Sequence, residues 1–174
     1  IKTINAKYFH EKSESRVELN YTIYGNGILK IRQTLYPSGV EYPELPRFGM
    51  KVSLNETFDE LEWFGRGPHE SYWDRKTSAK IDRYKGKVID QTYKYVRPQE
   101  TGNKTDIRWL ALYNGSIGLM IKGLPIFDGS VHHYDYSLLD YFKGGQRHGQ
   151  LDVIKGNQID LLVDYKQMGV GGDN

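Results

Sequence analysis

The sequence predicts an all-β protein, an antiparallel sandwich of two sheets, and two patterns support this. Apolar and polar residues alternate with a period of two, which is typical of strands that bury one face. Gly, Pro and Asn separate these short segments, as the turns between antiparallel strands require. Only one short helical turn is expected, at 137–142, with Ser137 as its N-cap.

Two hairpins are the clearest elements. Segments 17–23 and 29–35 flank a turn at Gly25-Asn26-Gly27, whose glycines can adopt a positive φ. The second hairpin turns at Asn114-Gly115. Its first strand runs over 107–113, where Trp109 alternates with the apolar residues and is therefore expected in the core.

Further strands are predicted at 48–54, 61–63 and 159–165, where apolar residues again alternate. Prolines and a glycine break the pattern near residue 40. We interpret this break as a connection between the two sheets, so residues 1–174 are expected to form a single domain.

The composition excludes several classes of function. The formal net charge is only +2, and no basic run exceeds two residues, so a nucleic-acid partner is not expected. No apolar stretch approaches the length of a membrane span. The absence of cysteine excludes disulfides, thiol catalysis and Cys-type zinc sites, but leaves the compartment open. The chain starts at Ile1 without a signal-like segment, so we expect an internal fragment or a mature product.

The most informative segment is 63–76, which reads Trp-Phe-Gly-Arg-Gly-Pro-His-Glu-Ser-Tyr-Trp-Asp-Arg-Lys. Its Gly-x-Gly-Pro run cannot continue as helix or strand, because glycine is entropically costly there and proline lacks the N–H. The segment is therefore expected to be a rigid loop dense in ionisable and aromatic side chains. Loops of this kind either bind a ligand or are held by internal ion pairs.

Three motifs together resemble one family: the run Trp63–Arg75, the Pro-x-Glu-x-Gly run Pro98–Gly102, and the Gly-x-Gly-Gly-Asp run Gly169–Asp173. Their order and spacing are similar to those of the C-terminal, small-chain domain of large β-galactosidases of the glycoside hydrolase 2 type. The resemblance covers about Leu45 to Asn174 strongly and the preceding residues weakly. It implies a supersandwich like that of galactose mutarotase-like proteins.

The resemblance also implies that the catalytic residues lie in another part of the enzyme. In this family the catalytic carboxylates lie in a separate barrel upstream, so the chain is expected to be one domain of an enzyme that hydrolyses terminal β-galactosides with retention. The fragment alone is expected to be inactive, with the catalytic barrel as its partner and no cofactor. None of the family's catalytic residues matches a position in this sequence.

The residues offer one carboxylate pair to test, Glu70 and Glu100, which both lie in loops shaped by glycine and proline. The family resemblance implies that neither is catalytic. We expect instead that the loops Gly65–Arg75 and Val96–Asn103 pack together through arginine–carboxylate contacts. The arginines expected in this structural ion network are Arg66, Arg75, Arg97 and Arg108.

The alternative from another class is a free-standing carbohydrate-binding or mutarotase-like module. Its sugar groove would be formed by Trp73, Glu70, Glu100 and His132. Indole rings stack on sugars, and the resemblance to mutarotase-like proteins, which use a histidine acid and a glutamate base in this groove, implies the other roles. The flanking sequence discriminates the two hypotheses. An upstream barrel supports the first, and an independent start supports the second.

No metal site is expected. Adjacent His132 and His133 would point to opposite faces of a strand, and no pair of histidines has the spacing of a metal motif. The glycine-rich segment 169–172 lacks the Lys and Ser/Thr of a phosphate-binding loop, so it is interpreted as a tight loop in which Asp173 accepts backbone hydrogen bonds.

The chain also lacks the residues that follow Gly-x-Gly-Gly-Asp in the family, where a late aromatic residue helps to form the galactoside site. The sandwich is thus expected to lack its last strands and to expose a sheet edge near Gln158–Lys166. Self-association through that edge, or completion of the sheet by further residues, is the expected consequence.

Overall fold

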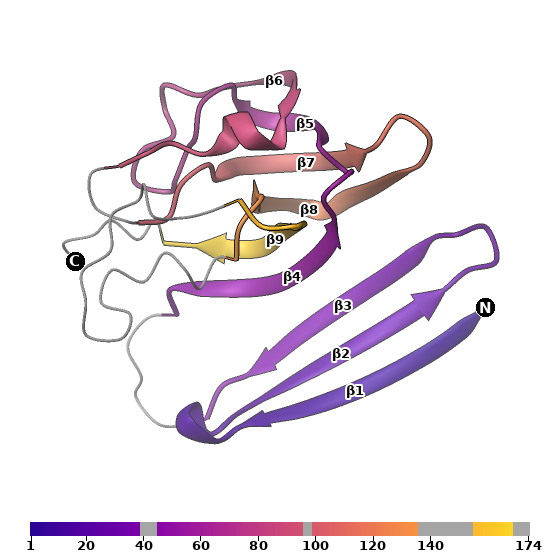
Figure 1. Ribbon diagram of the computed structural model, residues 1–174. Helices are drawn as coiled ribbons and strands as arrows, with labels where there is room; N and C mark the ends of the chain where they lie inside the picture. The colour runs from indigo at the N-terminus through magenta and orange to yellow at the C-terminus, as the bar shows by residue number, and fades with distance from the viewer. Residues whose placement is uncertain (39–44, 96–98, 136–154, 169–174) are drawn as a thin grey trace. The chain divides into compact units, whose positions relative to one another are not determined.

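The computed structural model describes residues 1–38, 45–95, 99–135 and 155–168 (Figure 1). Within them the protein is nearly all β, with two antiparallel sheets of three and six strands and two short 3-10 helices. The predicted all-β, two-sheet class is confirmed. The residues divide into two compact units, Ile1–Glu44 and Leu45–Asn174, each with its own sheet. The predicted break near residue 40 lies between the last strand of the first sheet and the first strand of the second, and residues 39–44 of it fall outside the described residues. The single domain over 1–174 stays a prediction.

The first unit is a meander of three strands in the order β1-β2-β3. These are β1 (Lys2–His10), β2 (Ser15–Ile23) and β3 (Leu29–Tyr36), with the 3-10 turn η1 (Glu11–Ser13) after β1. Gly27 has φ +85° in the tight turn between β2 and β3, as the sequence predicts. The register places apolar residues on one face of this sheet: Ile4, Ala6, Tyr8, Val17, Leu19, Tyr21, Ile23, Leu29, Ile31 and Leu35.

The second unit is a six-stranded sheet in the order β4-β9-β8-β7-β5-β6 (Figure 1). Its strands are β4 (Arg47–Asn55), β5 (Glu60–Gly67), β6 (Lys80–Lys87), β7 (Lys104–Tyr113), β8 (Gly118–His132) and β9 (Gln158–Gln167). The 3-10 helix η2 (Val88–Gln91) follows β6. The predicted hairpin at Asn114-Gly115 joins β7 to β8, with Gly115 at φ +88°.

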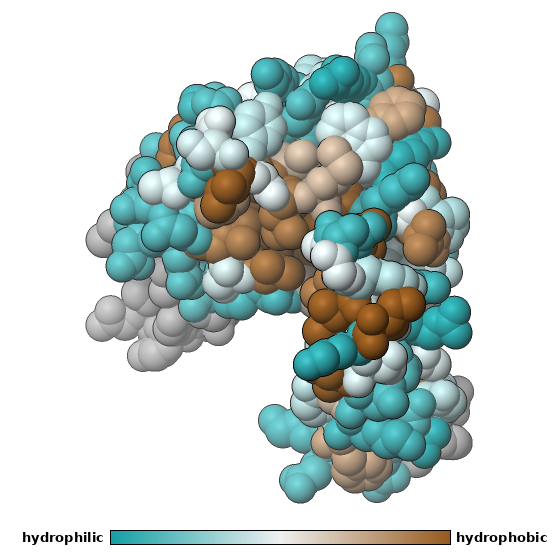
Figure 2. Space-filling model, turned by 90° about the vertical axis from the view of Figure 1, so that its right-hand side faces the viewer, coloured by the Kyte–Doolittle hydropathy of each residue, from teal (hydrophilic) through white to brown (hydrophobic). Residues whose placement is uncertain are grey.

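The core of the second unit lies on one face of its sheet. Directly paired residues across the strands supply it, for example Trp63 opposite Leu110 and Leu61 opposite Leu112. Ile159 and Leu161 of β9 extend the cluster and are fully buried. Other apolar side chains remain at the surface, where they gather in patches surrounded by hydrophilic residues (Figure 2).

The expected position of Trp109 in this core is wrong. The buried apolar positions of β7 are Ile107, Leu110 and Leu112, whereas Trp109 is only half-buried and faces the other side of the sheet. The pairing of β7 with β8 shifts register between Ile107 and Trp109, next to Asp106 with its positive φ of 56°. This bulge inserts a residue into the period of two, so alternation counted from Ile107 assigns the wrong face beyond it.

The expected open edge at Gln158–Lys166 is also wrong. Strand β9 pairs with β4 on one side and with β8 on the other, so it lies inside the sheet. The edge strands of this sheet are β4 and β6. Two further predictions, the helical turn from Ser137 and the loop at Gly169–Asp173, fall outside the described residues.

Candidate functional site

The loop after β5 is fixed at its base by Trp63. The indole nitrogen of Trp63 donates a hydrogen bond to the carbonyl oxygen of Arg66 at 2.9 Å. Strand β5 continues through Gly65 and ends at Gly67, so the expectation that the Gly-x-Gly-Pro run cannot continue as strand is wrong for its first three residues. Gly67 precedes a cis peptide bond to Pro68. A Cβ atom at Gly67 would lie 2.8–2.9 Å from the rings of Trp63 and Tyr84, so the loop starts at a position where the space fits only glycine.

Glu70 joins this loop to the segment before β7. Its Oε2 atom accepts hydrogen bonds from the backbone N–H of Gly102 at 2.7 Å and from the hydroxyl of Thr101 at 3.2 Å. Its Oε1 atom accepts one from the hydroxyl of Tyr95 and lies 3.7 Å from the guanidinium of Arg75. Burial and the contact with Glu70 raise the pKa of Tyr95. The carboxylate is thus held by donors from both segments.

Backbone contacts continue this connection. The N–H of Ser71 donates to the carbonyl of Asn103 at 2.8 Å, and the Asn103 amide donates back to the carbonyl of Ser71 at 2.8 Å. The Ser71 hydroxyl oxygen accepts from the N–H of Thr105 at 3.0 Å. All three residues are fully buried. The two loops are therefore packed together as predicted, but the described contacts between them pair the Glu70 carboxylate and other groups with hydroxyl, amide and backbone donors and acceptors, not with arginine.

Glu100 lies in a second, more deeply buried set of ionic contacts. It is 4% exposed, contacts the guanidinium of Arg47 and accepts a hydrogen bond from Gln167 at 2.7 Å. The same guanidinium lies 3.0 Å from Asp164. Burial, with repulsion from Glu100 and Asp128, raises the pKa of Asp164 to about 7, although Arg47 acts in the opposite direction. These contacts connect the start of β4 to β9 and to the loop before β7.

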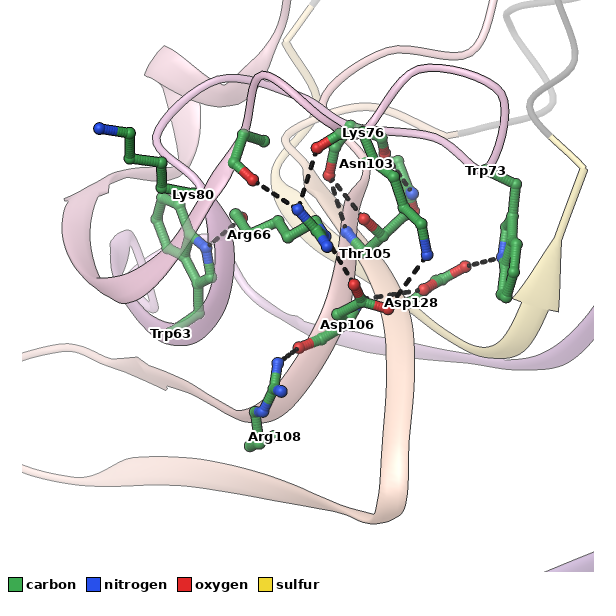
Figure 3. A network of polar contacts seen from close by, with 12 residues as sticks. Trp63, Arg66, Trp73, Lys76, Lys80, Asn103, Thr105, Asp106, Arg108 and Asp128 are labelled. Carbon is green, nitrogen blue, oxygen red and sulfur yellow. Dashed lines mark hydrogen bonds and ion pairs between the residues drawn. The ribbon is translucent and has the colours of Figure 1, made fainter.

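Asp106 is the centre of a third network, shown in Figure 3. Its carboxylate lies 2.6 Å from Nε of Arg66 and 3.5 Å from the ammonium of Lys76. Its backbone carbonyl accepts a hydrogen bond from Arg108 at 2.6 Å, and its N–H donates to Asp128 at 3.3 Å. The guanidinium of Arg66 also donates to two loop carbonyls, those of Lys76 and Ala79. The strained backbone at the bulge is therefore fixed through every polar group of Asp106.

Trp73 lies at the rim of this network and is 43% exposed. Its indole nitrogen donates to Asp128 at 2.9 Å (Figure 3). The ammonium groups of Lys76 and Lys166 lie 4.2 and 4.4 Å from the ring centre. Burial raises the pKa of Asp128 to about 6, despite the hydrogen bond from Trp73. Two lysines thus already contact the ring that was expected to stack on a sugar.

His132 is completely buried and stacks on Tyr134 with ring centres 4.7 Å apart. Neither of its ring nitrogens has a hydrogen-bond partner among the described residues. Burial lowers the pKa of His132 to about 3, so its ring is neutral near pH 7. Lys104 is buried nearby and donates to the carbonyl of Gly102 at 3.2 Å; burial lowers its pKa to about 8.

The residues singled out from the sequence are therefore distributed over several contacts. Arg66 and Arg75 form ion pairs with Asp106 and Glu70. Arg108 binds a backbone carbonyl, and Arg97 lies outside the described residues. The guanidinium seen at Glu100 belongs to Arg47 of β4, not to the opposite loop. The sugar-contacting roles of Trp73, Glu70, Glu100 and His132 stay predictions.

Sequence reasoning did not single out Arg47, Lys104, Asp106, Asp128 or Asp164. A signal existed for one of them: Asp106 interrupts a strand just before an apolar alternation, as a bulge residue does. The others are ordinary strand residues in the sequence, and only the pairing of β4, β7, β8 and β9 brings them together.

The described residues contain no group of three or more His, Cys, Asp or Glu side chains placed to hold a metal ion. Among them there is also no helix long and apolar enough to cross a membrane. What the arrangement holds is a set of ion pairs and hydrogen bonds that fix two loops against the six-stranded sheet.

Comparison with known proteins identifies the family. The model of the family described as "Beta galactosidase small chain" matches residues 1–174. The chain belongs to the β-galactosidase small-chain family. The predicted resemblance is thereby confirmed, and it extends to the N-terminal residues, where the sequence motifs are weak.

Relatives of this small-chain family are much longer than the chain. A protein named β-galactosidase from Priestia megaterium is 45% identical over 90% of the chain, which corresponds to 15% of that protein. Those from Halalkalibacterium halodurans and Vibrio cholerae are 33% and 30% identical over 95% and 98% of the chain, each over 16% of its own length. The chain therefore matches a small part of large enzymes.

Proposed function

We propose that the chain is the non-catalytic β-sandwich part of a β-galactosidase whose parent polypeptide hydrolyses terminal β-galactosides with retention. The observation that carries this proposal is that both candidate carboxylates already make ion pairs or hydrogen bonds within the protein. Retaining hydrolysis needs two carboxyl groups about 5 Å apart with a sugar between them. Glu100 is buried against Arg47 and Gln167, and both oxygens of Glu70 accept hydrogen bonds within the protein.

The role that fits these contacts is structural. Glu70, Glu100 and Asp106 each fix a loop or a strand end against the sheet. A surface fixed in this way can support a neighbouring catalytic barrel, because ordered loops present one fixed arrangement to the partner. The alternative of a mutarotase-like module has less support, since a catalytic His132 would need access to sugar and its ring is completely buried.

The test uses the parent enzyme and the chain together. Deletion of the small-chain part from the parent is expected to abolish hydrolysis of a chromogenic β-galactoside, and adding the chain in trans is expected to restore part of it. The matched control is the chain with Leu110→Asp, which places a charge in the core and should not restore activity. Full activity of the truncated parent would contradict the supporting role.

Sugar binding by the chain alone is a separate outcome. Titration calorimetry with galactose and lactose is expected to give no binding heat. A saturable heat that is lost in Trp73→Ala but kept in the control Trp109→Ala would favour the carbohydrate-binding alternative.

A further inference from the structure

The six-stranded sheet carries an unusual set of side chains on the face opposite its core. Residues that pair directly across β6, β5, β7 and β8 form rows on that face. One row reads Arg83, Phe64, Trp109 and Lys122, the next Lys85, Glu62, Ala111 and Met120, and a third Lys87, Glu60, Tyr113 and Gly118. We call Phe64, Trp109, Tyr113 and Met120 the outer-face patch.

This patch is accessible in the described structure. Met120 is 64% exposed and Phe64 is 37% exposed, while Trp109 and Tyr113 are half-buried. An antiparallel sheet with one face in water normally places polar residues on that face. Three aromatic rings and a methionine at neighbouring positions therefore indicate a face that is covered by another surface.

Cations surround the aromatic rings. The guanidinium of Arg83 lies 5.8 Å from the ring centre of Trp109, and that of Arg108 lies 5.6 Å from Phe64. The ammonium of Lys85 lies 5.9 Å from Tyr113. Aromatic residues, Met and Arg are the types enriched at the centres of protein interfaces, where they supply most of the binding energy.

The charge on this face selects the kind of partner. Arg83, Lys85, Lys87 and Lys122 outnumber the carboxylates Glu60 and Glu62. Both carboxylates are already paired, Glu62 with Arg83 and Glu60 with Lys87. The face is therefore net positive. A second copy bound through the same face would oppose cation to cation, whereas an acidic partner surface would be complementary.

We propose that the outer-face patch docks against an apolar surface with an acidic rim on the rest of the parent β-galactosidase polypeptide. This inference rests on the proposed function. It agrees with the chain's length, because the matched relatives extend over about six times as many residues as the chain covers, at 15% and 16% of their lengths. Trp109 supplies the indole ring of the docking surface, and Lys122, the exposed residue that pairs with it on β8, is the cation at the rim.

The experiment measures thiol accessibility in the full-length parent enzyme. Met120→Cys introduces a thiol in the patch, and the control Ser116→Cys introduces one in the exposed hairpin turn outside it. The chain has no cysteine of its own, so peptide-level mass spectrometry assigns alkylation within residues 1–174 without ambiguity. In the native parent, the thiol from Met120→Cys is expected to react roughly tenfold more slowly than the control, with equal rates in denaturant.

Charge reversal tests the acidic rim. Adding Lys122→Glu to the Met120→Cys variant is expected to accelerate alkylation several-fold, because like charges then face each other across the interface. Lys30→Glu, an exposed change on the three-stranded sheet, is the control and should leave the rate unchanged. An unchanged rate in Lys122→Glu would overturn the acidic partner.

Equal alkylation of Met120→Cys and Ser116→Cys in the native parent would overturn the docking surface. If the thiol from Met120→Cys loses its protection from alkylation when the parent is diluted to its monomer, the occupant is a second copy. That result would also overturn docking against the rest of the same polypeptide. β-Galactosidase activity of the same samples separates the two levels of inference. An active parent with a rapidly alkylated patch leaves the proposed function intact, whereas an inactive wild-type parent overturns that function whatever the labelling result.

Discussion

The carboxylate of Glu70 accepts the backbone N–H of Gly102 at 2.7 Å, and this contact joins the loop after β5 to the loop before β7. Gly102 has φ +76°, and a Cβ atom there would lie 2.3 Å from the carbonyl oxygen of Gln91. The glycine thus permits both the backbone conformation and the close approach that bring its N–H to Glu70. One carboxylate in a glycine-shaped loop serves a structural purpose here.

Replacing Glu70 should therefore destabilise the protein. Glu70→Ala leaves the donors of Gly102, Thr101 and Tyr95 unsatisfied and is expected to lower the free energy of unfolding by about 2–4 kcal/mol. Glu70→Gln keeps one acceptor oxygen and should cost about 1–2 kcal/mol. Urea denaturation of the chain measures both values. Equal stability of the wild type and Glu70→Ala would show that the loops do not depend on this contact.

Asp106 combines a positive φ with ion pairs, and substitutions separate the two contributions. Asp106→Ala loses the contacts with Arg66 and Lys76 and strains the backbone, so it should lower the free energy of unfolding by about 3–5 kcal/mol. Asp106→Asn tolerates the left-handed conformation and keeps hydrogen-bonding capacity, and should cost about 1–2 kcal/mol. The same denaturation assay measures both variants. A larger loss of unfolding free energy in Asp106→Asn than in Asp106→Ala would contradict this order.

The pH dependence of stability should reveal Asp164. Its pKa is raised in the folded protein to about 7, so the folded state holds the proton more tightly than the unfolded state. Between the ordinary aspartate pKa near 4 and pH 7, the unfolded state binds fewer protons, and stability falls as the pH rises, by up to about 1.4 kcal/mol per pH unit. His132, with its pKa lowered to about 3, acts in the opposite direction and masks part of this slope in the wild type.

The variant Asp164→Asn isolates the contribution of Asp164 to the pH dependence of stability. The stability of the wild type relative to Asp164→Asn should decline from pH 4.5 to pH 7 and then level off. Asp82→Asn, at an exposed position, is the control and should run parallel to the wild type. A parallel course for Asp164→Asn as well would show that Asp164 is ionised over the whole range.

The register of β7 gives a further prediction. Leu110→Ala removes a core side chain and should cost about 2–5 kcal/mol in the chain. Trp109→Thr changes the opposite, half-buried face and keeps a residue suited to strands, so it should cost less than about 1 kcal/mol. If Trp109→Thr were the more damaging change in denaturant titrations of the chain, the register across the bulge would be wrong.

The alternation of apolar residues was sufficient to predict the fold class and most strands, because each strand buries one face and the period of two records it. It failed at Trp109, where the bulge beside Asp106 changes the face without leaving a mark in the hydrophobic pattern. It also failed for β9, whose nearness to the end of the sequence suggested an edge. Strand order depends on contacts distant in sequence, and β9 inserts between β4 and β8.

The candidate site was predictable where its contacts lie within or between the two loop motifs. Arg75 and Glu70 are close in sequence and pair in the structure. Glu100 and Arg47 are 53 positions apart in the sequence. No sequence motif indicates that the elements carrying them lie side by side. Likewise, the exposure of Trp73 was foreseeable from its place in a loop, but the two lysines beside its ring come from different elements.

We propose that this chain supports a β-galactosidase without supplying its catalytic carboxylates. The most direct measurement is hydrolysis of a chromogenic β-galactoside by purified residues 1–174, with and without Glu100→Gln, beside the full parent enzyme. We predict turnover by the parent and none by the chain. Turnover by the chain that Glu100→Gln abolishes would contradict this proposal and place the catalytic centre at the loop before β7.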